Sequence, residues 1–156
     1  MTHYFDHAAT TPMRQVAIDA WAEHAHLLNP GGQYASGRAA NAVLAQARET
    51  IAEILGADPV EVVFTGSGTE ADNLALRGFA GDRIISTPIE HPAVRETVAD
   101  LAKHGADVEM LPVDERGVVD ITDALDEPAS VATCMWANNE TGALQPIDQI
   151  IARASD

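Results

Sequence analysis

Three polar segments of this chain carry residue types that could bind a small molecule. The first is Thr65-Gly66-Ser67-Gly68-Thr69-Glu70. At a strand-to-helix junction it would make a phosphate cradle, because glycines allow close approach and the first amides of a helix carry positive partial charge. An ordinary capped helix start has the same residue types, so the segment alone leaves both interpretations open. It matches neither a Walker A loop nor the Gly-x-Gly-x-x-Gly dinucleotide pattern.

The other two segments offer an aromatic face and an amide. His91 stands just before Pro92, and Asn139 stands in the loop Asn138-Asn139-Glu140-Thr141-Gly142. Taken singly, such a histidine is more often structural, and such amides often only satisfy turn backbone. All three segments follow predicted strands, and ligands in open α/β sheets bind beyond the carboxyl ends of strands. We therefore expect the three segments to lie along one edge of a sheet.

The hydrophobic pattern supplies the elements that would position them. Strands are predicted over four ranges: 60–65, 83–87, 107–111 and 129–136. Helices are predicted over six ranges: 13–28, 37–55, 70–79, 92–104, 120–125 and 146–154. Strands that alternate with helices indicate βαβ units, and so an α/β fold with a mostly parallel sheet flanked by helices.

Composition excludes several classes of partner. The apolar share of 46% is typical of a globular protein, and the net charge of −15 disfavours nucleic acid or anionic lipid. No apolar run approaches the roughly 18–20 residues that a membrane span needs, and the N-terminus shows no secretory pattern. We therefore expect no membrane partner and a cytoplasmic location. The single cysteine, Cys134, is predicted to be a small core residue, and no metal site is predicted.

Taken in order, the motifs resemble those of the cysteine desulfurases, class V members of the aminotransferase fold. The resemblance covers essentially all 156 residues and rests on ordered blocks: Tyr4-Phe5-Asp6-His7-Ala8-Ala9-Thr10-Thr11-Pro12, Asn29-Pro30, Gly37-Arg38, Leu55-Gly56-Ala57-Asp58-Pro59, the stretch 61–74, Glu90-His91-Pro92-Ala93-Val94 and the Asn138 loop. It implies part of the large domain of fold type I, with pyridoxal 5′-phosphate as cofactor. We expect a single α/β domain over 1–156, incomplete relative to the family. An N-terminal arm and helices would occupy 1–57, and the cofactor-binding portion 58–156.

The resemblance also implies roles for single residues. Gly68 and Thr69 match the pair that holds the cofactor phosphate. His91 matches the catalytic histidine that stacks on the pyridine ring and assists proton transfers, and Asn139 matches the asparagine that bonds the ring's 3′-oxygen. The family's phosphate loop usually reads Ser-Gly-Ala-Thr, whereas this chain reads Gly66-Ser67-Gly68-Thr69. The residues stay small and the threonine is kept, so we expect the cradle to survive.

Other family groups have no match here. The Schiff-base lysine, the aspartate at the pyridine nitrogen, the substrate arginine and the catalytic cysteine all lie further along in the family. The only lysine, Lys103, is expected at a solvated helix end, and Cys134 matches no nucleophile.

The resemblance therefore implies the N-terminal portion of a cysteine desulfurase, and we expect the chain alone to be inactive. The full enzyme would convert L-cysteine to L-alanine and an enzyme-bound persulfide for iron–sulfur cluster or tRNA thiolation pathways. Sulfur-acceptor proteins would be its partners, and it would be a homodimer. Two alternatives stay open: a non-catalytic subunit completed by a lysine-bearing chain, and another class V enzyme such as a selenocysteine lyase.

Overall fold

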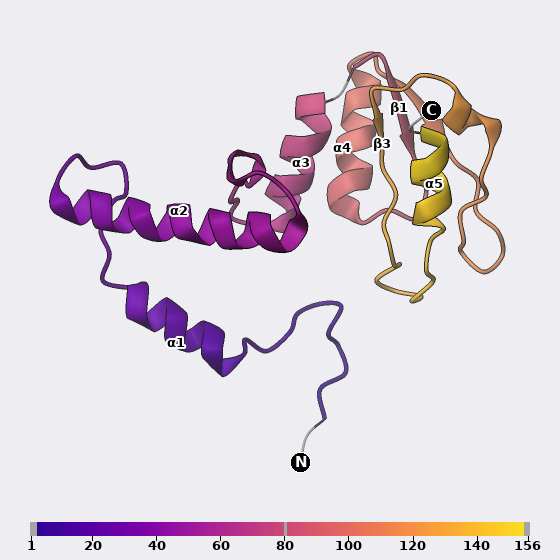
Figure 1. Ribbon diagram of the computed structural model, residues 1–156. Helices are drawn as coiled ribbons and strands as arrows, with labels where there is room; N and C mark the ends of the chain where they lie inside the picture. The colour runs from indigo at the N-terminus through magenta and orange to yellow at the C-terminus, as the bar shows by residue number, and fades with distance from the viewer. Residues whose placement is uncertain (1–2, 80, 155–156) are drawn as a thin grey trace. The chain divides into compact units, whose positions relative to one another are not determined.

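The structure is a computed structural model that describes residues 3–79 and 81–154. The chain divides into two compact units, Met1–Phe64 and Thr65–Asp156 (Figure 1). The single domain predicted over 1–156 stays a prediction, and each unit is considered by itself. Over the described ranges, no helix combines the length and the apolar character that crossing a membrane would require.

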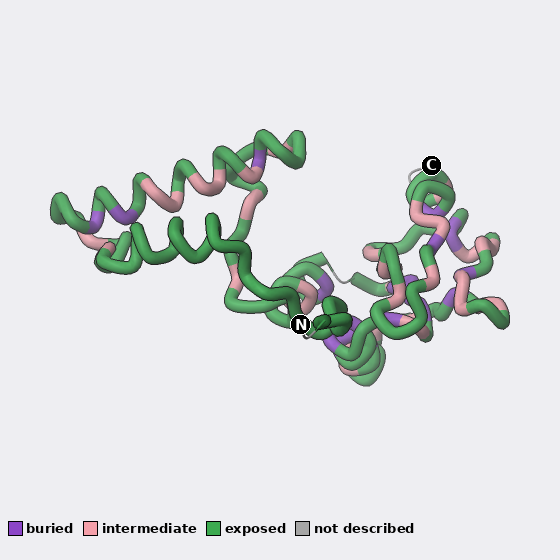
Figure 2. The backbone as a smooth tube through the Cα atoms, turned by 90° about the horizontal axis from the view of Figure 1, so that it is seen from below, coloured by how far each residue is buried: buried purple, intermediate pink, exposed green. Residues whose placement is uncertain are grey.

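In its described part, residues 3–64, the first unit consists of two helices and a single turn of 3-10 helix. Helix α1 (Gln15–His24) is shorter than the predicted 13–28 and buries none of its residues (Figure 2). Helix α2 (Ala35–Leu55) ends at Gly56, whose φ of 68° is the left-handed conformation that glycine adopts readily at helix ends. Near its start, a Cβ on the buried Gly37 would lie 2.3 Å from the Gly32 carbonyl oxygen. Only glycine therefore lets the preceding loop lie against this helix.

The strand predicted over 60–65 is wrong. The chain instead forms the 3-10 turn η1 (Pro59–Glu61), followed by residues without regular structure. Asp58 N donates to Glu61 Oε2 (2.7 Å), and Pro59 stands at the first position of the turn, where a missing N–H costs nothing. The Arg48 guanidinium then lies 5.1 Å from the centre of the Phe64 ring. These local contacts hold the segment within the first unit, where a β-branched run has no strand to pair with.

The second unit contains a three-stranded parallel sheet in the order β2-β1-β3. Its strands are β1 (Arg83–Ser86), β2 (Asp107–Met110) and β3 (Val131–Ala132). Helix α4 (Pro92–Lys103) connects β1 to β2, as a parallel pair requires. The prediction of an α/β fold with a mostly parallel sheet is confirmed. Strand β3 covers only part of the predicted 129–136. Thr133 N still donates to Ile85 O (2.9 Å), and Met135 N then donates to the Glu90 side chain described below.

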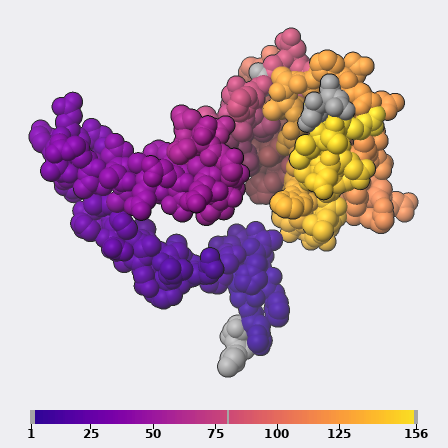
Figure 3. All heavy atoms as spheres, viewed as in Figure 1, coloured from indigo at the N-terminus to yellow at the C-terminus, as the bar shows by residue number. Residues whose placement is uncertain are grey.

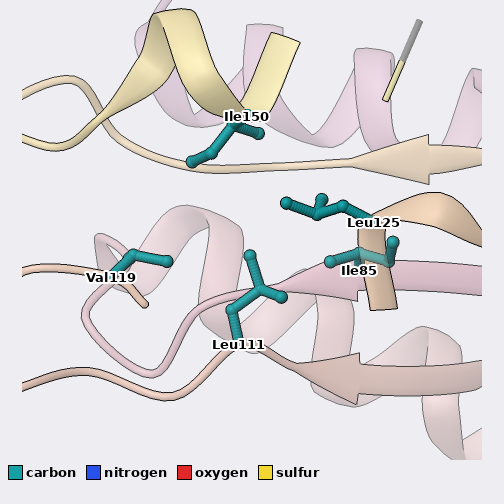
Figure 4. Packing of buried hydrophobic residues seen from close by; sticks show 5 residues of the cluster. All are labelled: Ile85, Leu111, Val119, Leu125 and Ile150. Carbon is teal, nitrogen blue, oxygen red and sulfur yellow. The ribbon is translucent and has the colours of Figure 1, made fainter. Parts of the chain in front are cut away.

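Two neighbouring isoleucines of β1 divide the second unit into layers. Ile84 packs against α4 and against α3 (Gly68–Phe79), and the cluster includes Leu76, Val94 and Val98. Ile85 points to the opposite face, because successive strand residues alternate. There it packs with Leu111, Val119, Leu125 and Ile150 (Figure 4). Burying each isoleucine stabilises the fold by roughly 1.5–3 kcal/mol, so β1 is a fixed base for the residues at its end.

The second face is covered by α5 (Ile147–Ala154) and by the 3-10 turn η2 (Asp123–Asp126). Arg153 of α5 pairs with Asp126 and lies 3.2 Å from an oxygen of Asp123, which holds these two elements together. Helix α5 is amphipathic: Ile150 is buried, while the helix's outer side forms part of the unit's surface (yellow in Figure 3).

Candidate functional site

The start of α3 is held by reciprocal side-chain caps. Ser67 Oγ accepts a hydrogen bond from Glu70 N (3.1 Å), and a Glu70 carboxylate oxygen accepts one from Gly66 N (2.7 Å). The arrangement resembles a capping box, but the carboxylate accepts from Gly66, the residue before the N-cap Ser67. Glu70 N is thus the one donor of the helix start that these caps satisfy. Within the described part of the chain, the N–H groups of Gly68 and Thr69 and the Thr69 hydroxyl form no hydrogen bond. They are the donors that remain for an anion.

The space beside Gly68 is open. A Cβ added to Gly68 would meet nothing within 4 Å, whereas one on Gly66 would lie 3.2 Å from Glu70 Oε2. Helix starts with open amides are favourable places for phosphate. The glycine that stands where the related family usually has alanine therefore leaves the cradle open.

His91 lies at the N-cap of α4, at the end of the short turn that follows β1. Its Nδ1 accepts a hydrogen bond from Ala93 N (3.1 Å), which fixes the ring and leaves the proton of the neutral imidazole on Nε2. The exposed His91 and Thr69 line one hollow of about 420 Å³, together with Asn73, Arg77, Pro92, Ala93, Glu96 and Thr97. The structure thus brings the phosphate segment and the histidine to the same cavity.

Asn139 lies in the loop after β3, and its neighbour Asn138 organises that loop. Asn138 Oδ1 accepts from Glu140 N (3.0 Å) and Thr141 N (2.9 Å), while Nδ2 donates to Ile89 O (3.2 Å). The exposed Asn139 lines a second hollow of about 290 Å³, formed with Pro88, Ile89, Glu90, Pro92, Arg95, Asn138 and Glu140. Pro92 lines both hollows, so they adjoin.

The predicted placement is therefore correct in part. His91 and Asn139 follow the ends of β1 and β3, which are neighbouring parallel strands. The phosphate segment does not follow a strand, because residues 62–65 form none. Its contact with the site comes instead from α3, which packs beside α4 in the cluster around Ile84. The roles assigned to Gly68, Thr69, His91 and Asn139 stay predictions.

Glu90 is a site residue that the sequence did not reveal. It is 5% exposed, and its Oε1 accepts from Met135 N (3.1 Å) and from the Thr133 hydroxyl (3.3 Å). Burial raises the pKa of this carboxyl, the two hydrogen bonds oppose the rise, and the negative charge of Asp72 adds to it. The signal in the sequence that could have identified it is a glutamate in the short turn between a buried strand and a helix start.

Lys103 and Cys134 are poorly suited to covalent chemistry at this site. Lys103 is exposed at the far end of α4 from His91, and a helix of 12 residues spans roughly 18 Å. Cys134 is half-buried and packs against the cluster around Ile85. Burial, and then the Glu90 charge, raises the pKa of its thiol to about 11, so it is protonated at neutral pH.

Comparison with known proteins identifies one family. The sequence pattern of the family described as aminotransferase class-V matches residues 3–156. An "IscS-like cysteine desulfurase" of Mycobacterium tuberculosis is 43% identical, and the match covers 94% of this chain and 42% of that protein. A "putative cysteine desulfurase IscS 1" of Bacillus subtilis is 39% identical, with the same coverage of 94% and 42%.

Solved structures give the same result. A "NifS-like protein" superposes with a TM-score of 0.91 at 34% identity, covering 99% of this chain and 46% of that one. A structure titled "SspA in complex with cysteine" gives a TM-score of 0.89 at 32% identity, covering 99% and 48%. This chain therefore spans less than half the length of the relatives it matches.

Proposed function

This chain belongs to the class-V aminotransferase family, and on that basis we propose that it supplies the phosphate- and ring-binding groups of a pyridoxal-phosphate-dependent cysteine desulfurase. One observation carries the proposal. The unbonded donors of Gly68 and Thr69 open beside a hollow that Thr69 shares with His91. Relatives named as cysteine desulfurases, at 43% and 39% identity, support the reaction class.

In this proposal each residue has a separate task. The amides of Gly68 and Thr69 and the Thr69 hydroxyl donate to the phosphate dianion, where the partial charge of the helix start favours it. His91, held by its cap to Ala93 N, presents its ring and can give or take a proton at Nε2. The Asn139 amide donates to a ring oxygen. When bound, pyridoxal phosphate supplies the electron sink for negative charge that develops on the amino-acid substrate.

We propose L-cysteine as the substrate and sulfur-acceptor proteins as the partners of the complete reaction. That reaction also needs an amine to hold the cofactor covalently and a reactive thiolate. The exposed Lys103 and the protonated Cys134 suit neither task. We therefore expect this chain by itself to bind the cofactor without a covalent bond and to release no sulfide from L-cysteine. The homodimer implied by the resemblance and the cytoplasmic location expected from the composition stay predictions.

The proposal is tested by titrating pyridoxal 5′-phosphate into the chain and following the phosphorus resonance. Removing one charge-assisted hydrogen bond should weaken binding about tenfold in Thr69→Ala. Thr50→Ala is the control, because among the described residues the exposed Thr50 hydroxyl bonds only the carbonyl of Gln46 in its own helix. An unchanged dissociation constant in Thr69→Ala, or no binding by the unaltered chain, would contradict the proposal.

A further inference from the structure

Glu90 is a buried carboxylate whose partners lie on another part of the chain. Both hydrogen bonds to its Oε1 come from the segment after β3, 43 and 45 positions further along, at Thr133 and Met135. None of the ion pairs among the described residues involves Glu90. A buried carboxylate without a cation is costly unless hydrogen bonds compensate it. The hydrogen bonds from Thr133 and Met135 therefore offset the cost of burying the carboxylate. The same bonds hold these two residues against Glu90.

The two segments joined by Glu90 are those that carry the ring-side residues of the site. His91 follows Glu90 directly in the chain. Met135 stands three residues before Asn138, whose side chain donates to the Ile89 carbonyl (3.2 Å) and caps the loop that carries Asn139. The turn after β1 and the loop after β3 are thus tied twice, once at Glu90 and once at Ile89. Neither tie involves the start of α3.

The geometry points to Glu90 as a positioning residue: its carboxylate clamps the segment Thr133–Met135 to the turn that carries His91 and thereby sets Asn139 relative to His91. This inference rests on the proposed function, in which His91 and Asn139 bind the cofactor ring. The clamp itself is a property of the ligand-free chain. It acts on the ring-side groups alone, because the caps at Ser67 and Glu70 are formed within α3 and its own lead-in.

Two substitutions separate the clamp from a general packing role. Glu90→Gln keeps an oxygen that accepts from Thr133 and Met135, whereas Glu90→Leu fills similar space and accepts nothing. Glu115→Leu is the matched control, because Glu115 is an exposed residue of the turn after Val113. Thr133→Val removes one donor while keeping the carboxylate, so it tests the clamp even if Glu90→Leu does not fold.

The measurement is a nitrogen–proton correlation spectrum of the labelled full chain, with and without pyridoxal 5′-phosphate. In Glu90→Leu the ligand should still shift the amide of Thr69, while the side-chain amide of Asn139 should no longer respond. The dissociation constant should rise about tenfold, the effect of one lost polar contact. Glu90→Gln should restore the Asn139 response, and Thr133→Val should give a weaker change in the same direction.

Other results would overturn the inference. An unchanged Asn139 response in Glu90→Leu and Thr133→Val would show that Glu90 does not position Asn139. A joint loss of the Thr69 and Asn139 responses would show general destabilisation in place of a clamp. If the unaltered chain shows no Thr69 response, the proposed function fails and the ligand-free spectra decide on the clamp. There, Glu90→Leu must speed exchange of the Met135 amide about tenfold, because a lost acceptor exposes that donor, and must leave the Glu70 amide unchanged.

Discussion

Cys134 offers a direct measurement of the electrostatics around Glu90. Burial and the Glu90 charge raise the pKa of its thiol from 9.0 to about 11. At pH 8 the thiolate share would be about 9% for the ordinary value and about 0.1% for the raised one, so alkylation should slow about 90-fold. In Glu90→Gln the smaller of the two causes is removed. The pKa should therefore fall by less than half of the rise, and the rate should increase less than tenfold.

The assay is iodoacetamide labelling followed by mass spectrometry between pH 7 and pH 10. Since Cys134 is the only cysteine, every labelled molecule reports on it, and the chain unfolded in guanidinium gives the reference rate. The native rate should rise tenfold for each pH unit across this range, because the thiol remains mostly protonated. A native rate that levels off near pH 9, or that lies within threefold of the unfolded rate at pH 8, would refute the reasoning. A slower rate in Glu90→Gln would show that the sign of the charge effect is wrong.

Three other perturbations test the packing and the proton balance. In Gly37→Ala the new Cβ meets the Gly32 carbonyl at 2.3 Å, so urea unfolding of the first unit should show a loss of about 1–3 kcal/mol. Gly68→Ala should cause no loss in the second unit, where its Cβ would meet nothing within 4 Å. Ile85→Ala should lower the free energy of unfolding by about 2–5 kcal/mol in thermal unfolding. A decrease below about 1 kcal/mol would contradict a core position for Ile85. Because the pKa of Glu90 is raised above 4.5, the native state binds more protons than the unfolded state, and stability should fall as pH rises from about 4.5 through the raised value. Unfolding at a series of pH values should show this fall flattened in Glu90→Gln, and parallel profiles would contradict it.

Local signals in the sequence were sufficient for much of the fold. The parallel sheet followed from alternating strands and helices, and the donors at Gly68 and Thr69 followed from a cap formed within four residues. The strand predicted over 60–65 failed because β-branched residues favour a strand only where a neighbouring strand is present. There the turn started by Pro59 determined the local structure instead.

The contacts of Glu90 were beyond local reasoning for a different reason. Its partner Met135 lies 45 positions away, and no pattern within a single element encodes that pairing. The chain after β3 shows the same dependence on distant partners, since Thr133 N donates to Ile85 O while Met135 N donates to the Glu90 carboxylate. A glutamate after a strand could be noted from the sequence, but its role depended on the arrangement of two strands.

The sheet order also implies a sequence of events in time. Ile84 pairs with Val108 of β2 and with Val131 of β3, and the second partner lies about twice as far along the chain. Contacts between distant positions form late in folding, and a strand of two residues has few bonds to keep it closed. We therefore expect the segment after β3 to open more often than the start of α3. Faster hydrogen exchange at Met135 than at Ala71 would show this, and the reverse order would exclude it. A ligand would then be captured stepwise, first by its phosphate on a preformed helix start and later by its ring as the β3 side closes.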